Sequence, residues 1–408
     1  MKSSFGGVVV VLVACGAPAP SVPKGPPANA AQFTLQCPER GLRAFDQARG
    51  LVTGVPLACA AHAADRQGTP LKDVAVSFLV EAGRVTAEPL TSATGSAAVA
   101  YETALPLPAA VEPGIFSFTP LNDATHTGAF LAPLWMMPFD WNENPVLFGM
   151  NATLREPRRP DPLRPQPDGG VLQNNPRDNL VTLMAWADGE EGFVDANANG
   201  TWDPGETFMD LTEPFLDVDD DGTWTEPEQF IDTNANGRWD GKNAAWDAQT
   251  KIWVQERVLW TGVPAPEDVA LTVPGVTGHR PTMGSSPRVA LSCTFSPCAS
   301  AGRLEVVVFM SDPWFNRLAH EGSSDECRLA APPAVVVTPS SLALSAQNEW
   351  PASQRFLAVV SDSRDPATPT PRRTPPLDFT VPFLCTLSAT RSQPAAQFVF
   401  NVITGSIE

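Results

Sequence analysis

Oxygen-bearing side chains recur at regular spacing between residues 189 and 247. The pentad Glu-x-Phe-x-Asp occurs four times there, at 191–195, 206–210, 213–217 and 228–232. Three of its aspartates, Asp195, Asp217 and Asp232, each open a segment of twelve residues. In each segment a carboxylate, amide or hydroxyl side chain stands at positions 1, 3, 5 and 9, and a glycine stands at position 6. This alternation brings hard oxygen atoms to one side of a tight turn, as a metal site requires.

The spacing matches the calcium-binding loop of EF-hand proteins. Calcium takes about six to eight oxygen ligands, which alternating short side chains and the backbone carbonyl of position 7 supply. The predicted ligands of the first segment are Asp195, Asn197, Asn199, Thr201 through its carbonyl, Asp203 and Glu206. Those of the second are Asp217, Asp219, Asp221, Thr223 through its carbonyl, and Glu228. Those of the third are Asp232, Asn234, Asn236, Arg238 through its carbonyl, and Asp240.

The third segment lacks the carboxylate that closes the other two at position 12, where it has Asn243. We therefore expect this site to bind calcium more weakly, or to be completed by Asp247. Because Asp, Asn and Gly are ordinary turn formers, one such segment alone could be a metal-free turn. Its repetition, with Phe two residues before each first aspartate and Trp at position 8, favours calcium binding.

The charge of the chain is concentrated in the same stretch. From Asp188 to Asp247 there are 17 acidic and 2 basic residues, whereas the net charge of all 408 residues is −18. Carboxylates at this density repel one another unless cations neutralise them. Pro204, Pro214 and Pro227 exclude long helices between the segments. The stretch therefore resembles the helix-free calcium repeats of thrombospondin type 3 and of bacterial surface proteins, which implies permanently loaded structural sites.

The first residues predict export and a lipid anchor. Residues 1–15 hold one lysine, a short apolar run and the sequence Leu12-Val13-Ala14-Cys15, which resembles the lipobox of a bacterial lipoprotein signal peptide. The resemblance implies that Cys15 is lipidated and attaches the protein to a membrane, with the outer membrane or cell surface as the expected location. The alternative is an ordinary signal peptide that happens to contain a cysteine. Residues 16–31 are rich in Pro and Ala and predict an extended tether.

Strand patterns dominate the rest of the chain, and 43 prolines argue against a helical protein. Val74, Val76, Phe78 and Val80 alternate with smaller residues, and Thr91-x3-Gly95-x-Ala97-x-Val99 follows after a glycine turn. This arrangement resembles the immunoglobulin-like domain of invasin and intimin. The resemblance implies a β-sandwich that serves as a spacer or adhesion stalk and has no active site.

We therefore predict an all-β protein of tandem immunoglobulin-like β-sandwiches with a calcium-binding loop insertion. The expected domains are 32–135, a β-sandwich; 136–264, which carries the calcium segment 188–247 between two strands; and 265–408, a second sandwich. The Pro- and Arg-rich run at 155–170 is expected to be a solvated linker, and nucleic acid is not an expected partner.

Disulfide bonds are permitted by export. Without Cys15, six cysteines remain: Cys37, Cys59, Cys293, Cys298, Cys327 and Cys385. The economical pairing joins Cys37 to Cys59 and keeps the other four within the last domain. The alternative is that the cysteines are reduced and buried.

Catalytic signatures are missing from the sequence. None of the four histidines lies in an HExxH pair, and no G-x-S-x-G elbow or phosphate-binding glycine loop occurs. The expected function is a calcium-stabilised, lipid-anchored surface protein with a structural or binding role and no enzymatic activity. One alternative is an adhesin or carbohydrate-binding protein that contacts a surface protein or polysaccharide through exposed aromatic side chains. A less favoured one is an enzyme or enzyme subunit with its site in 136–180 or in the last domain.

Overall fold

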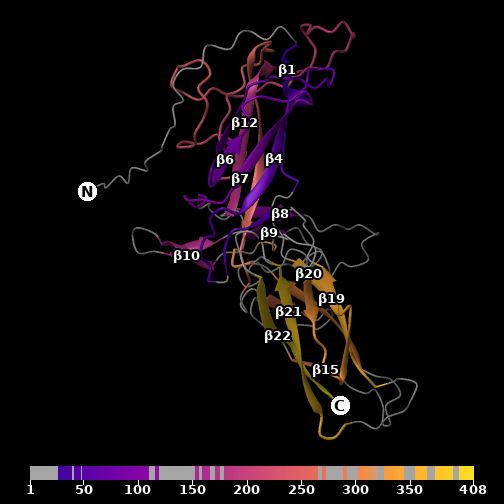
Figure 1. The fold of residues 1–408 in the computed structure, drawn as a ribbon. Helices are drawn as coiled ribbons and strands as arrows, with labels where there is room; N and C mark the ends of the chain where they lie inside the picture. The colour runs from indigo at the N-terminus through magenta and orange to yellow at the C-terminus, as the bar shows by residue number, and fades with distance from the viewer. Residues whose placement is uncertain are drawn as a thin grey trace.

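The computed structural model shows an all-β chain whose longer strands gather into two β-sandwiches (Figure 1). It describes residues 26–38, 41–46, 48–109, 115–118, 152–155, 159–165, 171–174, 179–264, 269–272, 288–291, 302–310, 312–314, 316, 318, 326–343, 354–364, 373–388 and 395–408. Within them the one helical element is the 3-10 turn η1 (Ala30–Gln32). No helix of the described residues is long and apolar enough to cross a membrane. The predicted signal peptide, Cys15 and most of the tether lie outside the described residues.

Two sheets form the N-terminal sandwich. The first contains, in spatial order, β1 (Ala28–Asn29), β12 (Leu180–Glu190), β13 (Thr250–Thr261) and β3 (Gly41–Arg43), with β5 (Val76–Val80) also paired to β12. The second contains β2 (Thr34–Gln36), β4 (Pro56–His62), β7 (Ser96–Glu102) and β6 (Arg84–Ala87). Alternate residues such as Leu57, Val99 and Val258 point into one shared core. The predicted alternation in β5 is confirmed, since Val76 is buried and Phe78 and Val80 pack against this core.

The domain boundary predicted between residues 135 and 136 is wrong. Strands from both sides of it lie in one sheet, because β5 pairs with β12 from Val76↔Ala187 to Val80↔Leu183. The physical reason is the length of the two strands around the calcium segment. β12 and β13 present a continuous apolar face that needs a second sheet to cover it, and the sheet built around β4 and β7 covers it.

The C-terminal half forms the second predicted sandwich. Its first sheet contains β14 (Val269–Thr272), β16 (Arg303–Met310), β20 (Gln354–Asp362) and β18 (Val335–Thr338). Its second sheet contains β15 (Arg288–Leu291), β22 (Ala396–Ile407), β21 (Leu377–Leu387), β17 (Glu326–Leu329) and β19 (Ser341–Ala343). Val306, Val360, Phe383 and Ile403 are fully buried between the sheets.

Two short ribbons complete the strands: β8 (Ile115–Phe118) with β9 (Ala152–Arg155), and β10 (Arg159–Pro165) with β11 (Val171–Asn174). The sequence predicted a solvated linker at 155–170. The structure differs, because β10 lies within this run and pairs with β11.

Two disulfides are present in the described residues, and both agree with the predicted division. Cys37–Cys59 joins the neighbouring strands β2 and β4, and Cys327–Cys385 joins β17 and β21. All four cysteines are buried. Cys293 and Cys298 lie outside the described residues.

A turn from the C-terminal half packs into the core of the N-terminal sandwich. Trp314 is 1 % exposed, and its ring centroid lies 4.3 Å from that of Phe45. The backbone N–H of Gly262 donates to Asp312 Oδ2 at 2.9 Å, and Arg43 Nη2 donates to the carbonyl of Ser388 at 2.8 Å. A Cβ atom at residue 262 would lie 3.0 Å from the Trp314 ring, so glycine permits this close approach.

Candidate metal centre

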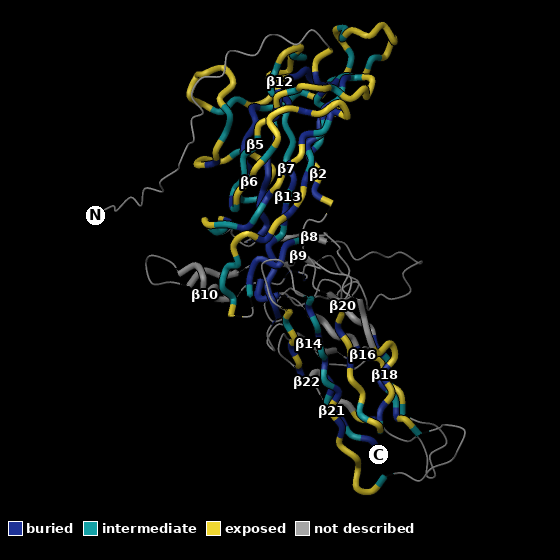
Figure 2. Tube along the Cα trace, in the orientation of Figure 1, coloured by how far each residue is buried: buried dark blue, intermediate teal, exposed yellow. Residues whose placement is uncertain are grey.

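The calcium segment is the connection between two paired strands, as the sequence predicted. β12 and β13 are antiparallel neighbours whose register ends at Gly189↔Thr250, and residues 191–249 join them. Figure 2 shows much of this connection exposed at the surface, whereas β12 is mostly buried and β13 alternates between buried and half-buried residues. A connection of this length is entropically costly to order unless further interactions hold it.

The outward face of the first sheet holds part of the connection. Alternate residues of β13 point away from the sandwich core, where Trp253 Nε1 donates to the carbonyl of Thr212 at 3.0 Å and Gln255 Nε2 donates to that of Phe215 at 2.5 Å. From β12, Thr182 Oγ1 donates to the carbonyl of Asp217 at 2.9 Å. Residues 212–217, which lead into the second segment, are therefore held on the outward face of the sheet.

The three predicted segments share one geometry. In each, the backbone N–H groups of positions 5 and 6 donate to the carboxylate of the first aspartate at 2.7 to 3.1 Å. The N–H of position 7 donates to the side-chain oxygen of position 5 at 2.7 Å in all three. Position 6 is a glycine with φ of 76 to 79°, a conformation that glycine adopts without strain. In each segment the backbone therefore folds around the side-chain oxygens of positions 1 and 5.

A glutamate closes each of the first two segments. Glu206 accepts hydrogen bonds from the N–H groups of positions 2 and 9, Ala196 at 2.8 Å and Asp203 at 3.0 Å. Glu228 accepts from the N–H groups of the same two positions in the second segment, at 2.7 and 2.8 Å. Both carboxylates are thereby fixed against the other oxygen donors, as position 12 of a calcium loop requires.

The carboxylate that closes the third segment belongs to Glu213, which lies outside that segment in the sequence and was not among the predicted ligands. Its carboxylate accepts from the N–H of Thr233 at 2.7 Å and of Asp240 at 3.1 Å, again positions 2 and 9. The suggestion that Asp247 completes this site is therefore wrong. The physical reason is an antiparallel bridge between Phe215 and Phe230, which places the pentads 213–217 and 228–232 side by side.

A fourth set of candidate metal ligands has the same geometry, although its residues are far apart in sequence. The N–H groups of Asn243 and Ala244 donate to Asp210 at 3.1 and 3.0 Å, and Ala244 has a φ of 61°. Glu191 accepts from the N–H of Leu211 at 2.7 Å and of Asp247 at 3.0 Å. Asp210, Asn243, Asp247 and Glu191 thus occupy the places of positions 1, 5, 9 and 12.

One signal in the sequence could have revealed this set. The pattern Asn-x-x-Trp-Asp spans positions 5 to 9 of the first and third segments, and it recurs at 243–247. Sequence counting missed it because the first aspartate, Asp210, precedes Asn243 by 33 residues. The pentad at 206–210 supplies that aspartate, and no twelve-residue segment of this pattern follows it.

Aromatic side chains join the four sets in two pairs. Trp202 stacks on Trp246 with ring centroids 5.7 Å apart, and Trp224 stacks on Trp239 at 5.3 Å. The phenylalanine rings of the pentads meet these stacks edge-on, at 5.5 to 6.1 Å. The recurring Phe and Trp positions therefore form a small aromatic core, which aligns the first set with the fourth and the second with the third.

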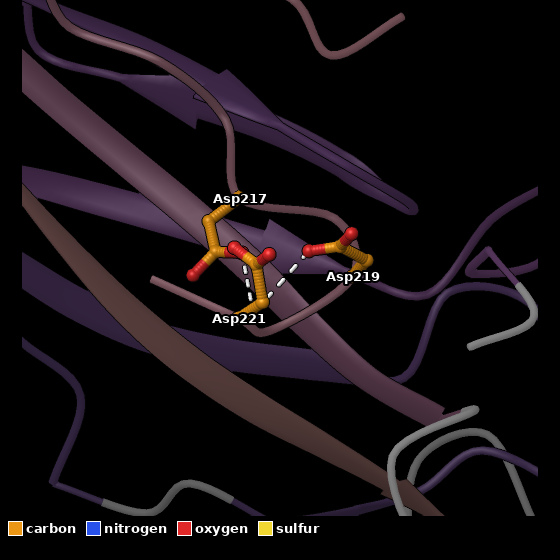
Figure 3. A group of neighbouring side chains, drawn as sticks. All are labelled: Asp217, Asp219 and Asp221. Atoms are coloured by element: carbon orange, nitrogen blue, oxygen red, sulfur yellow. Dashed lines mark hydrogen bonds between the residues drawn. The ribbon is translucent and has the colours of Figure 1, made fainter. Parts of the chain in front are cut away.

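The second segment concentrates negative charge most strongly. The carboxylates of Asp217, Asp219 and Asp221 point towards one another in Figure 3, and ligand oxygens from all three lie within 4.8 Å of one another. Burial raises the pKa of Asp217, which the nearby Arg257 guanidinium partly offsets, and burial also raises the pKa of Glu228. Arg257 Nη2 lies 2.5 Å from Asp217 Oδ2. Ionised carboxylates in this position are stabilised by positive charge.

The donor chemistry fits calcium. The side chains of all four sets offer carboxylate, amide or hydroxyl oxygens, and none of the four includes a histidine or cysteine. Hard oxygen donors select Ca²⁺ or Mg²⁺ over the transition metals, and flexible loops with many ligands suit the larger Ca²⁺.

Comparisons with known proteins identify no family. No family model matches the chain, and no curated protein matches it. One solved structure that matches is FdeC, described as a novel, broadly conserved Escherichia coli adhesin eliciting protection against urinary tract infections. It is 10 % identical, the match covers 92 % of this chain and 98 % of that chain, and the TM-score is 0.15. A similarity at this level assigns neither fold nor function.

Proposed function

We propose that residues 191–249 bind calcium and that the bound ions hold this connection folded on the N-terminal sandwich. The observation that carries the proposal is the repeated closure by Glu206, Glu228 and Glu213, each of which spans positions 2 and 9 of a segment with an EF-hand-like donor pattern. Three segments with one geometry are hard to explain as ordinary turns, because a turn does not require a glutamate that accepts hydrogen bonds from its second and ninth residues.

The fourth set is included in the proposal, so the expected number of calcium ions is four. Glu191 is only 1 % exposed, and among the described residues it forms no ion pair. Burial raises its pKa. A calcium ion held by Glu191, Asp210 and Asp247 would compensate the buried charge.

The role that we propose for the protein is a calcium-stabilised, lipid-anchored structural or binding module at the bacterial surface. The lipobox-like sequence ending at Cys15 supports the anchor, and the two sandwiches support the role of a spacer. A surface protein or polysaccharide is the proposed partner, and nucleic acid is not. Extracellular calcium sites bind with dissociation constants of about 0.1–1 mM, so such sites are loaded outside the cell.

Adhesion through exposed aromatic side chains remains the alternative, as proposed from the sequence. The tryptophans of the calcium segment stack on one another, and the exposed large apolar residues of the described regions are Leu, Val and Met. This arrangement favours a structural role for the aromatic residues. An adhesive contact would then use another part of the surface.

Calcium titration tests the proposal. We expect isothermal titration of residues 16–408 to count four sites, and calorimetric melting to show a higher unfolding temperature with calcium than with a chelator. At a calcium concentration ten times the dissociation constant, each site adds about 1.4 kcal/mol to the free energy of unfolding. Absence of both binding heat and a thermal shift would overturn the proposal.

Magnesium and a charge variant are the controls. Magnesium at the same concentration should give a smaller thermal shift, because it dehydrates reluctantly and prefers a rigid octahedral site. Glu226→Gln removes one exposed carboxylate of the second segment that is not among the proposed ligands, and it should leave the number of sites unchanged.

A further inference from the structure

The second and third calcium sites exchange their closing residues. Glu213 belongs to the pentad whose aspartate, Asp217, opens the second site, yet its carboxylate closes the third. Glu228 belongs to the pentad whose aspartate, Asp232, opens the third site, yet it closes the second. Each site therefore depends on a short stretch of chain that also supplies a ligand to the other.

The two pentads are held rigidly together. Phe215 and Phe230 form an antiparallel bridge, in which the N–H of Leu216 donates to the carbonyl of Gln229 and the N–H of Ile231 donates to that of Pro214, both at 2.8 Å. Only one residue separates the bridging phenylalanine from the aspartate that opens each site. A displacement of either glutamate is thus transmitted to the first ligand of the neighbouring site.

Two tryptophans further join the second and third sites. Trp224 and Trp239, from position 8 of each segment, stack at 5.3 Å. Their indole N–H groups donate to the carbonyls of the two exchanged glutamates, Trp224 to Glu228 and Trp239 to Glu213, both at 3.1 Å. Each tryptophan therefore fixes the backbone of the glutamate that closes its own segment.

From this exchange we infer that the second and third sites fill as one cooperative unit. The inference rests on the proposed calcium binding. An ion at the second site draws in Glu228, which orders Asp232 through residues 228–232. An ion at the third site draws in Glu213, which orders Asp217 in the same way. Binding of the first ion already includes part of the entropic cost of ordering both sites, so the second ion binds more tightly. The effect is reciprocal, because each ion raises the affinity for the other by the same factor.

The first and fourth sites repeat the exchange. Glu206 closes the site that Asp195 opens, and Glu191 closes the site that Asp210 opens. Phe193 and Phe208 form the corresponding bridge. The same reasoning makes this second pair a unit of its own.

Two glycine amides allow each site to be followed separately. The N–H of Gly222 donates to Asp217 at 3.1 Å, and that of Gly237 donates to Asp232 at 2.8 Å. Their NMR signals in protein labelled with [¹⁵N]glycine will therefore respond to calcium at the second and third sites respectively. In the wild-type protein we expect both signals to titrate with one midpoint and a Hill coefficient clearly above one.

Glu213→Gln provides the decisive measurement. It removes a contact of the third site alone, so a weakening of calcium binding reported by Gly237 is expected with or without coupling. Coupling predicts that the Gly222 midpoint also rises, about tenfold for a coupling of typical size. Glu228→Gln should give the converse result with the same factor.

The failures of the two proposals are distinguishable. A Glu213→Gln variant whose Gly222 midpoint stays within twofold of wild type overturns the cooperative unit and leaves calcium binding intact. Wild-type signals of Gly222 and Gly237 that ignore calcium overturn calcium binding itself. Glu206→Gln is the matched control, because it acts in the other pair and should leave both midpoints unchanged. If a variant misfolds, separate midpoints with Hill coefficients of one in the wild-type protein would still overturn the inference.

Discussion

Tyr101 is the one tyrosine of the chain, and it lies in the core of the N-terminal sandwich. Its hydroxyl donates to the carbonyl of Ala82 at 3.0 Å and accepts from Trp260 Nε1 at 2.8 Å. The bond to Ala82 requires the neutral phenol as donor, whereas the bond from Trp260 would also suit the phenolate, which burial disfavours. Burial therefore raises the pKa of Tyr101 well above its usual value.

A single tyrosine makes the consequence directly measurable. Because the pKa is raised in the folded state, the stabilising contribution of the neutral phenol is complete below about pH 10, the ordinary pKa of tyrosine, and declines as the pH rises above it. We expect ultraviolet absorbance to show no tyrosinate in the folded protein at pH 10.5 to 11, and to show it when the protein unfolds.

The control for this titration is Tyr101→Phe, which removes the tyrosinate signal altogether. Tyrosinate that forms near pH 10 while circular dichroism still reports a folded protein would contradict the placement of the phenol.

At the scale of elements, the turn at 65–69 connects the first sandwich to the calcium segment. Arg66 forms an ion pair with Glu190, whose side chain is 6 % exposed, at 3.1 Å. It also donates to the carbonyl of Gly200 at 2.6 Å and lies over the ring of Phe193. One arginine therefore holds the end of β12 and the first twelve-residue segment together.

Arg66→Met should destabilise the protein by about 3 kcal/mol, because it leaves the carboxylate of Glu190 buried without its partner. Urea denaturation in saturating calcium measures this. Arg84→Met is the matched control, since the Arg84–Glu102 pair is exposed and its loss should cost less than about 1 kcal/mol. Equal losses for the two variants would show that the Arg66 contacts do not support the calcium segment.

At the scale of the whole molecule, the turn containing Trp314 joins the two sandwiches. Asp312 is fully buried and accepts from the N–H groups of Gly262, Trp314 and Asn316 at 2.8 to 2.9 Å. These bonds hold Trp314 against Phe45. The contact buries Trp314 in the core of the N-terminal sandwich, so the two sandwiches should unfold together.

Trp314→Ala removes the largest side chain of this contact and should cost about 3–5 kcal/mol. We expect calorimetry of the wild-type protein to show one cooperative transition and that of the variant to show two. Val336→Ala, at an exposed position of the C-terminal sandwich, should keep the single transition. A single transition in the Trp314 variant would show that other contacts couple the two halves.

The local signals of the sequence determined the kind of structure correctly. Alternation at Val76 and Val80 indicated a half-buried strand because successive side chains of a strand point to opposite faces. The spacing of Asp195, Asn197 and Asn199 indicated a tight turn because a twelve-residue loop is shaped by its own side chains, and calcium binding by that turn stays a prediction. These patterns depend on neighbours along the chain, so one sequence was enough to see them.

The tertiary structure alone decided which distant residues meet. No pattern near the third segment indicates Glu213, because the antiparallel bridge between Phe215 and Phe230 brings its pentad there. No pattern near Asp210 indicates Asn243, because the two are 33 residues apart and meet only in the folded connection. The shared core of residues 26–109 and 179–264 likewise depends on β5 pairing with β12. Such pairings are selected by the burial of apolar faces that no single element can cover, and that free energy is a property of the folded whole.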